Sequence, residues 1–314
     1  MWTRRWYSPE ALALQRATGA ADPALAIRQL AAALIDEAGF AQPPVHPAIL
    51  ASCQDVHEVR QRPMVSAARL VRDSGRLVIE VNEDHSAGKQ NFSTDHEVSH
   101  TLLPTYTGYS VDDAATGLFA ATSEEELLCD IGAAALLLDE RWLRPLGLEA
   151  GPSIQTLLTV AELFGASLEA TARRLAELDL WSCAFVVWEE GYRKNERIHD
   201  GQGLMPGLES YGRPKPELRV KRPYAAPSFG HYIPWNKSIE ATSLVGQCCA
   251  ECIMTWGVEP FDLGSRVVSL YCENLHAPYR TGQTVCRRVI SLLLPVGSAS
   301  GPTRTSYSYQ FEIW

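Results

Sequence analysis

Residues 93–104 read STDHEVSHTLLP and contain two histidines four positions apart, His96 and His100, with Glu97 directly after the first. On an α-helix, residues four apart project from the same face, so the two imidazoles would lie side by side. That arrangement is typical of a zinc site in which the glutamate stands beside the metal. The alternative is a helix that carries two ordinary histidines.

The flanking residues favour a helix over 92–103. Ser93 or Thr94 is a suitable N-cap, and Asp95 and Glu97 would then occupy the first turn. Before this helix, residues 75–82 alternate as a half-buried strand does, and a polar loop is expected over residues 84–91. The motif is therefore expected on a helix that follows a strand and a loop.

A third protein ligand is required, because a catalytic zinc ion takes three and leaves one position for water. Residues 123–143, SEEELLCDIGAAALLLDERWL, have the pattern of a second helix with an acidic first turn. We predict Glu126 as the third ligand and Asp130, one turn later, as the hydrogen-bond partner of a ligand histidine. A glutamate run at a helix start is usually just solvated, so this prediction depends on the histidine motif.

Two stretches together, QNFSTDHEVSHTLLP (90–104) and EEELLCDIGAAALLL (124–138), resemble the ImmA/IrrE family of metallopeptidases. The resemblance covers roughly residues 25–190 and rests on these two specific motifs. It implies a zincin-like fold, with His96, His100 and Glu126 as the zinc ligands and Glu97 as the general base. Asp130 matches the position after the Cys or Ala of the second motif, and manganese is an alternative metal.

Four positions depart from the family pattern without removing a ligand or the base. Asp95 stands where a small residue is frequent, and Ser99 where glycine is common. Gly132 replaces a usual aromatic residue, and Asp139 replaces a usual proline. These departures bear on substrate choice more than on metal binding.

The implied function is a zinc-dependent endopeptidase. Zinc would activate a water molecule and polarise the peptide carbonyl, while Glu97 would carry the proton to the leaving amine. Tyr106 and Tyr109 follow the motif helix and are candidate hydrogen-bond donors to the oxyanion, although a loop tyrosine is more often simply packed. The resemblance implies a helix-turn-helix transcriptional repressor as the protein substrate, cut after a stress or mobile-element signal.

We expect an α+β fold in three parts. Residues 1–148 would form a mostly helical zincin-like metallopeptidase domain with a short β-sheet, and residues 149–181 a helical hairpin. Residues 182–314 would form a β-rich domain that is regulatory or binds a partner. The hairpin has the outline of a helix-turn-helix, but its acidic residues balance its arginines, so it lacks a basic recognition face.

Composition and charge argue against a nucleic-acid-binding, membrane-spanning or secreted protein. The net charge is −9, and residues 1–181 carry the acidic excess, so strong direct nucleic-acid binding is not expected. The sequence has no apolar run long enough for a membrane span and no secretory signal, which favours the cytoplasm. The eight cysteines, among them Cys248, Cys249 and Cys252, are expected to be reduced and mostly structural, since no matching pair completes a metal site.

A non-enzymatic function remains as the alternative. The same fold could keep zinc as a structural or sensing centre in a module that sequesters a regulator. Retention of Glu97 favours the enzyme, because a structural site has no use for a base. A fourth protein ligand in place of water would favour the alternative.

Overall fold

The computed structural model describes residues 5–104, 106, 123–192, 216–264, 266–281 and 284–297, and these adopt the predicted α+β fold. The chain forms two compact units. The first unit comprises residues 1–149 and 157–174, and the second comprises residues 150–156 and 175–314. The three-part division predicted from the sequence stays a prediction, since compactness does not establish which parts fold independently.

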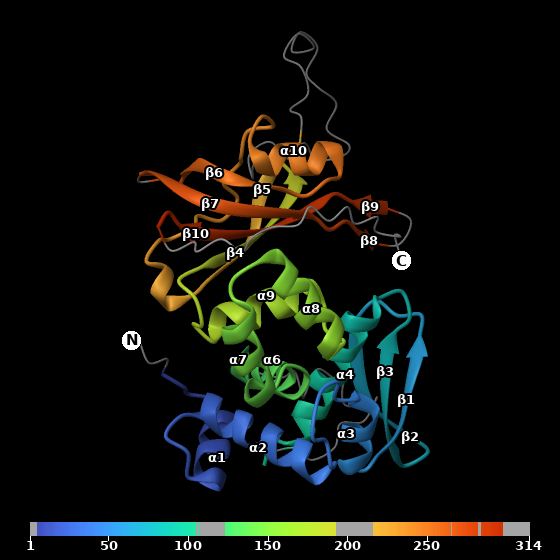
Figure 1. Ribbon diagram of the computed structural model, residues 1–314. Coiled ribbons are helices and arrows are strands. Elements are labelled where there is room, and N and C mark those ends of the chain that lie inside the picture. The colour runs from blue at the N-terminus through green and yellow to red at the C-terminus, as the bar shows by residue number, and fades with distance from the viewer. Residues whose placement is uncertain are drawn as a thin grey trace. The chain divides into compact units, whose positions relative to one another are not determined.

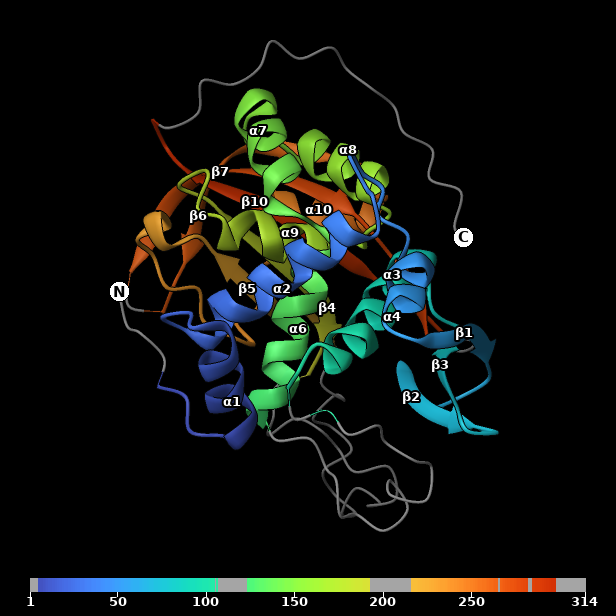
Figure 2. The same ribbon diagram turned by 90° about the horizontal axis from the view of Figure 1, so that it is seen from below.

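The first unit combines helices with a small sheet (Figure 1). Its elements, in chain order, are α1 (Pro9–Thr18), α2 (Pro23–Glu37), α3 (Pro47–Cys53), β1 (Val56–Arg62), β2 (Ala68–Asp73), β3 (Arg76–Asn82), α4 (Ala87–Thr101), α6 (Ser123–Leu137) and most of α7 (Glu140–Ala150), α8 (Ile154–Phe164) and α9 (Leu168–Glu177). The central strand β3 pairs in parallel with β1 and antiparallel with β2. Helix α2 lies alongside α6 in both ribbon views (Figures 1 and 2).

Local signals set the starts of the first two helices. The Ser8 hydroxyl accepts a hydrogen bond from the Ala11 N–H, and the Asp22 carboxylate accepts one from the Ala24 N–H. Each cap is followed by a proline in the first turn, where the missing N–H costs nothing. Both starts agree with the pattern of the sequence.

The motif helix α4 begins at Ala87, so the predicted start at 92 is wrong, and of the predicted polar loop over 84–91 only residues 84–86 are non-helical. Ser93 and Thr94 are buried inside the helix and do not cap it. The additional turn packs on the connection between α8 and α9. There the Asn91 side chain donates to the Gly165 carbonyl at 2.9 Å, and a Cβ on Gly88 would lie 2.6 Å from the Ser167 nitrogen. Tertiary contact thus extends the helix beyond its local sequence signal.

The second unit is built on a five-stranded antiparallel sheet in the order β5-β4-β10-β7-β6. Its elements are β4 (Ala184–Gly191), β5 (Glu217–Ala225), the 3₁₀ turn η1 (Pro227–Phe229), α10 (Leu244–Glu251), β6 (Thr255–Asp262), β7 (Val267–His276), β8 (Tyr279–Thr281), β9 (Thr284–Cys286) and β10 (Arg288–Pro295). The sequence predicts short strands over residues 183–191, 265–273 and 287–295, which correspond to β4, β7 and β10. A fourth predicted strand, over residues 306–314, lies outside the described residues.

Helix α10 covers one face of this sheet and closes its hydrophobic core. Cys248 and Cys249 from α10 and Cys272 from β7 are buried in that core, as expected of structural cysteines, whereas Cys252 is exposed. Among the described residues, no helix has the length and hydrophobicity needed to cross a membrane.

A buried carboxylate ties the small sheet of the first unit together. Glu80 on β3 is 5% exposed and receives ion pairs from Arg60 on β1 at 2.8 Å and from Arg69 on β2 at 2.6 Å. Burial alone would raise the pKa of Glu80, but the hydrogen bonds from the two arginines outweigh it and lower that pKa below its ordinary value.

The lowered pKa of Glu80 predicts a loss of stability in acid. Glu80 binds a proton less readily in the folded protein than in the unfolded chain, where glutamates titrate at about pH 4.3. The stabilisation is therefore present above that pH and is lost as the pH falls through the lowered pKa. Glu80→Gln should reduce the free energy of unfolding at pH 7 by about 1–3 kcal/mol and flatten its acid dependence, as measured by urea denaturation.

The exposed neighbour Glu83 offers the control. Glu83→Gln should leave both the stability at pH 7 and its acid dependence close to those of the wild type. If Glu80→Gln and the wild type lost equal stability on acidification, Glu80 would not be the source of the acid dependence.

Candidate metal centre

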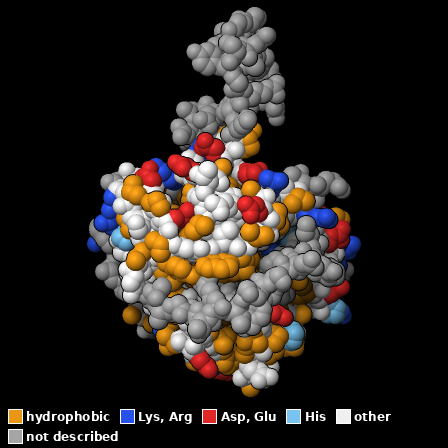
Figure 3. Space-filling model, turned by 45° about the horizontal axis from the view of Figure 1, so that its top comes forward, with side chains coloured by type: hydrophobic (Ala, Val, Ile, Leu, Met, Phe, Trp, Pro, Cys, Tyr) orange, Lys and Arg blue, Asp and Glu red, His pale blue; other side chains and the backbone are white. Residues whose placement is uncertain are grey.

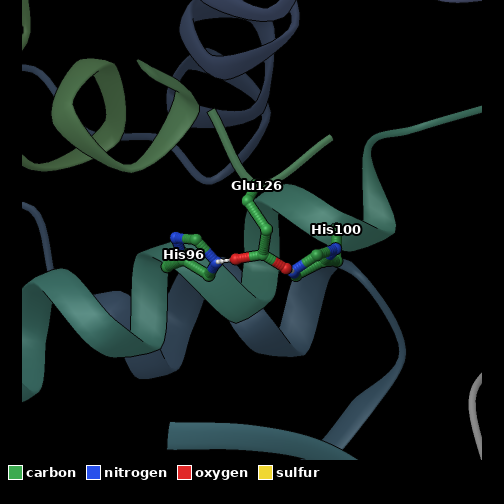
Figure 4. Close-up of side chains that lie close together, drawn as sticks. All are labelled: His96, His100 and Glu126. Carbon is green, nitrogen blue, oxygen red and sulfur yellow. Dashed lines mark ion pairs between the residues drawn. The ribbon is translucent and has the colours of Figure 1, made fainter. Parts of the chain in front are cut away.

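The structure brings His96, His100 and Glu126 together (Figure 4). Both histidines project from one face of α4, and Glu126 reaches from the first turn of α6 to a position between the two imidazoles. A ring nitrogen of each histidine and a carboxylate oxygen of Glu126 lie within 4.8 Å of one another. The spacing that suggested the motif therefore produces a compact group of two nitrogens and a carboxylate.

Each histidine is oriented by a second carboxylate on its other ring nitrogen. His96 Nδ1 lies 3.1 Å from Asp130 Oδ1, and His100 Nδ1 lies 3.2 Å from Glu125 Oε1. Hydrogen bonds at Nδ1 fix the ring orientation and leave Nε2 directed at Glu126. Asp130 occupies the position expected from the sequence, whereas the sequence analysis missed Glu125, which is 5% exposed.

The distances from Glu126 to the two histidines are close to those between ligand atoms around a zinc ion. Glu126 Oε2 lies 3.2 Å from His96 Nε2, and Glu126 Oε1 lies 3.8 Å from His100 Nε2. Two ligand atoms bound tetrahedrally to one zinc ion are about 3.4 Å apart, as follows from zinc–ligand bonds near 2.1 Å. The three residues therefore have the donor types and the spacing of a three-ligand site.

A close contact between α4 and α6 sets these distances. A Cβ on Gly132 of α6 would lie 2.6 Å from the Ser99 hydroxyl oxygen and 2.9 Å from the Ser99 Cβ on α4. The Ser99 hydroxyl is itself held by a 2.7 Å hydrogen bond to the Asp95 carbonyl. Glycine at 132, where the family pattern has an aromatic residue, thus lets the two ligand helices approach each other directly.

Glu97 follows His96 on α4, and its carboxylate is largely removed from water. Burial raises the pKa of Glu97 above its ordinary value, against the opposing charges of His100 and His96. A hydrogen bond from the Leu70 backbone on β2 also reaches this carboxylate. A carboxyl group with a raised pKa, next to a metal site, has the proton affinity that a general base requires.

The histidines sit in a strongly negative environment. Burial opposes the charged form of His96, but the hydrogen bonds that it donates to Asp130 and Glu126, together with the charge of Glu97, raise the pKa of His96 to about 10. The hydrogen bond that Glu126 accepts from His96 in turn lowers the pKa of Glu126. Without a metal, His96 thus holds a proton that an incoming cation has to displace.

Asp95 is fully buried, and neither of its carboxyl oxygens has a hydrogen-bond partner among the described residues. Burial raises the pKa of Asp95 well above its ordinary range, which favours the neutral acid. The residue lies one helical turn before Ser99, on the side of α4 that packs into the unit. It therefore belongs to the packing of the helix and does not face the ligands.

The two tyrosines proposed as oxyanion donors remain predictions. Tyr106 is partly buried and packs against the hydrophobic core of the first unit. Tyr109 lies outside the described residues.

The arginines of the predicted hairpin point into the first unit. Arg173 Nη1 lies 3.8 Å from Asp130 Oδ2, and Arg174, 3% exposed, donates from Nε to the Leu138 carbonyl at 3.3 Å. Both side chains are therefore engaged within the unit and do not form a basic recognition surface. Arg173 also supplies a positive charge beside the carboxylate that orients His96.

Comparisons with known proteins agree with this geometry. Residues 51–176 match the model of the peptidase M78 family, described as the IrrE N-terminal-like domain, which confirms the resemblance seen in the motifs. A solved structure of a Mycobacterium tuberculosis transcriptional regulator has a TM-score of 0.54 at 12% identity, covering 86% of this chain and 76% of that chain. At that identity the likeness shows the fold alone. No curated protein matches the chain.

Removing Glu126 should abolish stable metal binding. Elemental analysis of the purified wild type should find about one zinc ion per chain, and Glu126→Ala should lose it, because two imidazoles alone do not complete a three-ligand site. Metal content that stays the same in Glu126→Ala would exclude Glu126 as a ligand.

The substitution Glu125→Ala should weaken metal binding without abolishing it. Loss of the carboxylate that orients His100 is expected to lower zinc affinity about 10–100-fold, as measured by competition with a chelator. Glu124→Ala is the matched control, since the Glu124 carboxylate contacts the Tyr7 and Ser8 backbone instead of a histidine. Equal affinities in the two variants would refute the positioning role of Glu125.

Proposed function

Because residues 51–176 match the IrrE N-terminal-like domain of the M78 peptidase family, we propose that this chain is a zinc-dependent endopeptidase. The observation that carries the proposal is Glu97 standing directly beside the group formed by His96, His100 and Glu126. Metal-dependent hydrolases use a general base next to a three-ligand metal site.

His96, His100 and Glu126 would hold the metal ion. When bound, zinc supplies a Lewis acid that lowers the pKa of water and polarises the substrate carbonyl. Manganese is the alternative metal. Asp130 and Glu125 keep the two imidazoles oriented through their Nδ1 atoms.

Glu97 would handle the proton during hydrolysis. Its carboxylate takes a proton from the attacking water and later delivers it to the nitrogen of the leaving amine. Burial raises the pKa of Glu97, which strengthens the carboxylate as a proton acceptor. Tyr106 and Tyr109 remain the proposed hydrogen-bond donors to the developing oxyanion.

The proposed substrate is a specific intracellular protein, a helix-turn-helix transcriptional repressor cut in a stress or mobile-element response. This proposal places the protein in the cytoplasm. The ImmA/IrrE resemblance supports it, and the transcriptional regulator that shares the fold is compatible with a function in gene regulation. Residues 182–314 would then be the part that regulates the peptidase or binds a partner.

The alternative is a protein that keeps the metal as a sensing centre and sequesters a regulator without cutting it. The fold shared with a transcriptional regulator along most of the chain is the observation that favours it. The two functions differ in what they require of Glu97, since only the enzyme needs a base.

Replacing Glu97 by glutamine should abolish proteolysis and leave the metal in place. The rate of cleavage of a helix-turn-helix repressor, followed by mass spectrometry, should fall about 10²–10⁴-fold in Glu97→Gln, because the amide cannot accept the proton. Zinc content should remain at about one ion per chain. Glu83→Gln, an exposed change, should retain wild-type rates.

The outcome separates the two functions. Cleavage that depends on Glu97 establishes the enzyme. Tight binding of a repressor by wild type and Glu97→Gln alike, with no cleavage by either protein, would establish the sequestering module instead.

A further inference from the structure

The second unit contains a cavity of about 530 Å³ on the sheet face that α10 covers. Its lining is largely hydrophobic, with Trp188 from β4, Val220 from β5, Phe261 from β6 and Leu293 from β10. The volume falls within the range of about 300–1,000 Å³ that small-molecule sites occupy. The cavity therefore has the size and lining of a ligand site.

One wall of the cavity is held in place by hydrogen bonds to β5. The Val220 N–H donates to the Lys237 carbonyl at 2.9 Å, and the Ile239 N–H donates to the Leu218 carbonyl at 3.0 Å. The buried Arg219 side chain donates to the Asn236 carbonyl at 3.0 Å. The wall is therefore formed before any ligand binds.

The cavity is lined by more acidic than basic side chains. Its charged lining residues are Glu217, Glu240, Glu259, Asp262 and Lys237. Lys237 pairs with Asp262 at 2.6 Å, and Glu217 pairs with Arg219. Glu240 and Glu259 have no ion pair with any residue that the structure describes. The cavity thus keeps a surplus of negative charge.

Of these two carboxylates, Glu259 is the better placed to bind a positively charged ligand. It lies on β6, is partly buried, and accepts a 2.9 Å hydrogen bond from the Leu244 N–H at the start of α10. Trp188 is also fixed, because its Nε1–H donates to the Ser291 hydroxyl at 2.9 Å. Aromatic rings attract cations, so Trp188 and Glu259 favour the same kind of ligand.

We propose that this cavity binds an organic cation, a protonated amine on a hydrophobic body. The ammonium group pairs with Glu259, and the body packs against Trp188 and Phe261. Figure 3 shows acidic and hydrophobic side chains close together on one face of the molecule. The proposal does not depend on peptidase activity.

Two probes of similar shape and opposite charge test this site on the full chain. Isothermal titration should show saturable binding of tryptamine, and indole-3-propionate should bind at least about tenfold more weakly. Thr242→Lys places a positive charge on an exposed lining position and should weaken tryptamine binding about fivefold or more. Ala250→Lys adds the same charge to an exposed position of α10 outside the lining and should leave binding unchanged.

Glu259→Gln supplies the second test. It should weaken tryptamine binding about tenfold while keeping an oxygen that can accept the Leu244 hydrogen bond. The proposal is overturned if wild type shows no saturable tryptamine binding, if both probes bind equally well, or if neither Thr242→Lys nor Glu259→Gln weakens binding. Because Thr242 is exposed, its replacement tests the site even if Glu259→Gln does not fold.

Discussion

The direct packing of α4 on α6 is the contact on which the metal centre depends. The two helices run in opposite directions, since His96 meets Asp130 while His100, one turn later, meets Glu125. In this chain Gly132 packs directly on Ser99. A side chain added at 132 would meet Ser99 and displace the three site carboxylates of α6, unless residue 99 were the glycine that is common in the family pattern.

Much of the site could be predicted because the residues that form it follow from local sequence patterns. Two histidines four apart share a helical face whatever the rest of the chain does, and an acidic first turn supplies a carboxylate on the next helix. Glu125 could not be predicted in the same way. In a run of three glutamates, only the packing angle between the helices decides that Glu126 faces both imidazoles while Glu125 turns to the back of His100.

The fold was harder to predict where neighbours outweigh the local signal. Residues 87–91 look like a polar loop, yet contacts of Gly88 and Asn91 with the α8–α9 connection make them helical. Strand β3 forms where it was predicted, but it lies at the centre of its sheet and is buried continuously from Val78 to Asn82, so the predicted half-buried alternation is wrong. Strands β1 and β2 lie at the edges of the sheet and show no regular alternation of burial.

The charges around the histidines explain why a cation belongs in this centre. Four carboxylates, from Glu97, Glu125, Glu126 and Asp130, surround two imidazoles, and Arg173 is the cation that approaches them from α9. These carboxylates raise the pKa of His96 to about 10, so that without a metal a proton on His96 offsets part of the negative charge. His96, His100 and Glu126 would hold a divalent ion in place of that proton, with more positive charge at the same point. The carboxylates that crowd the imidazoles would then face a cation, so an arrangement that is costly without a metal would become favourable with one.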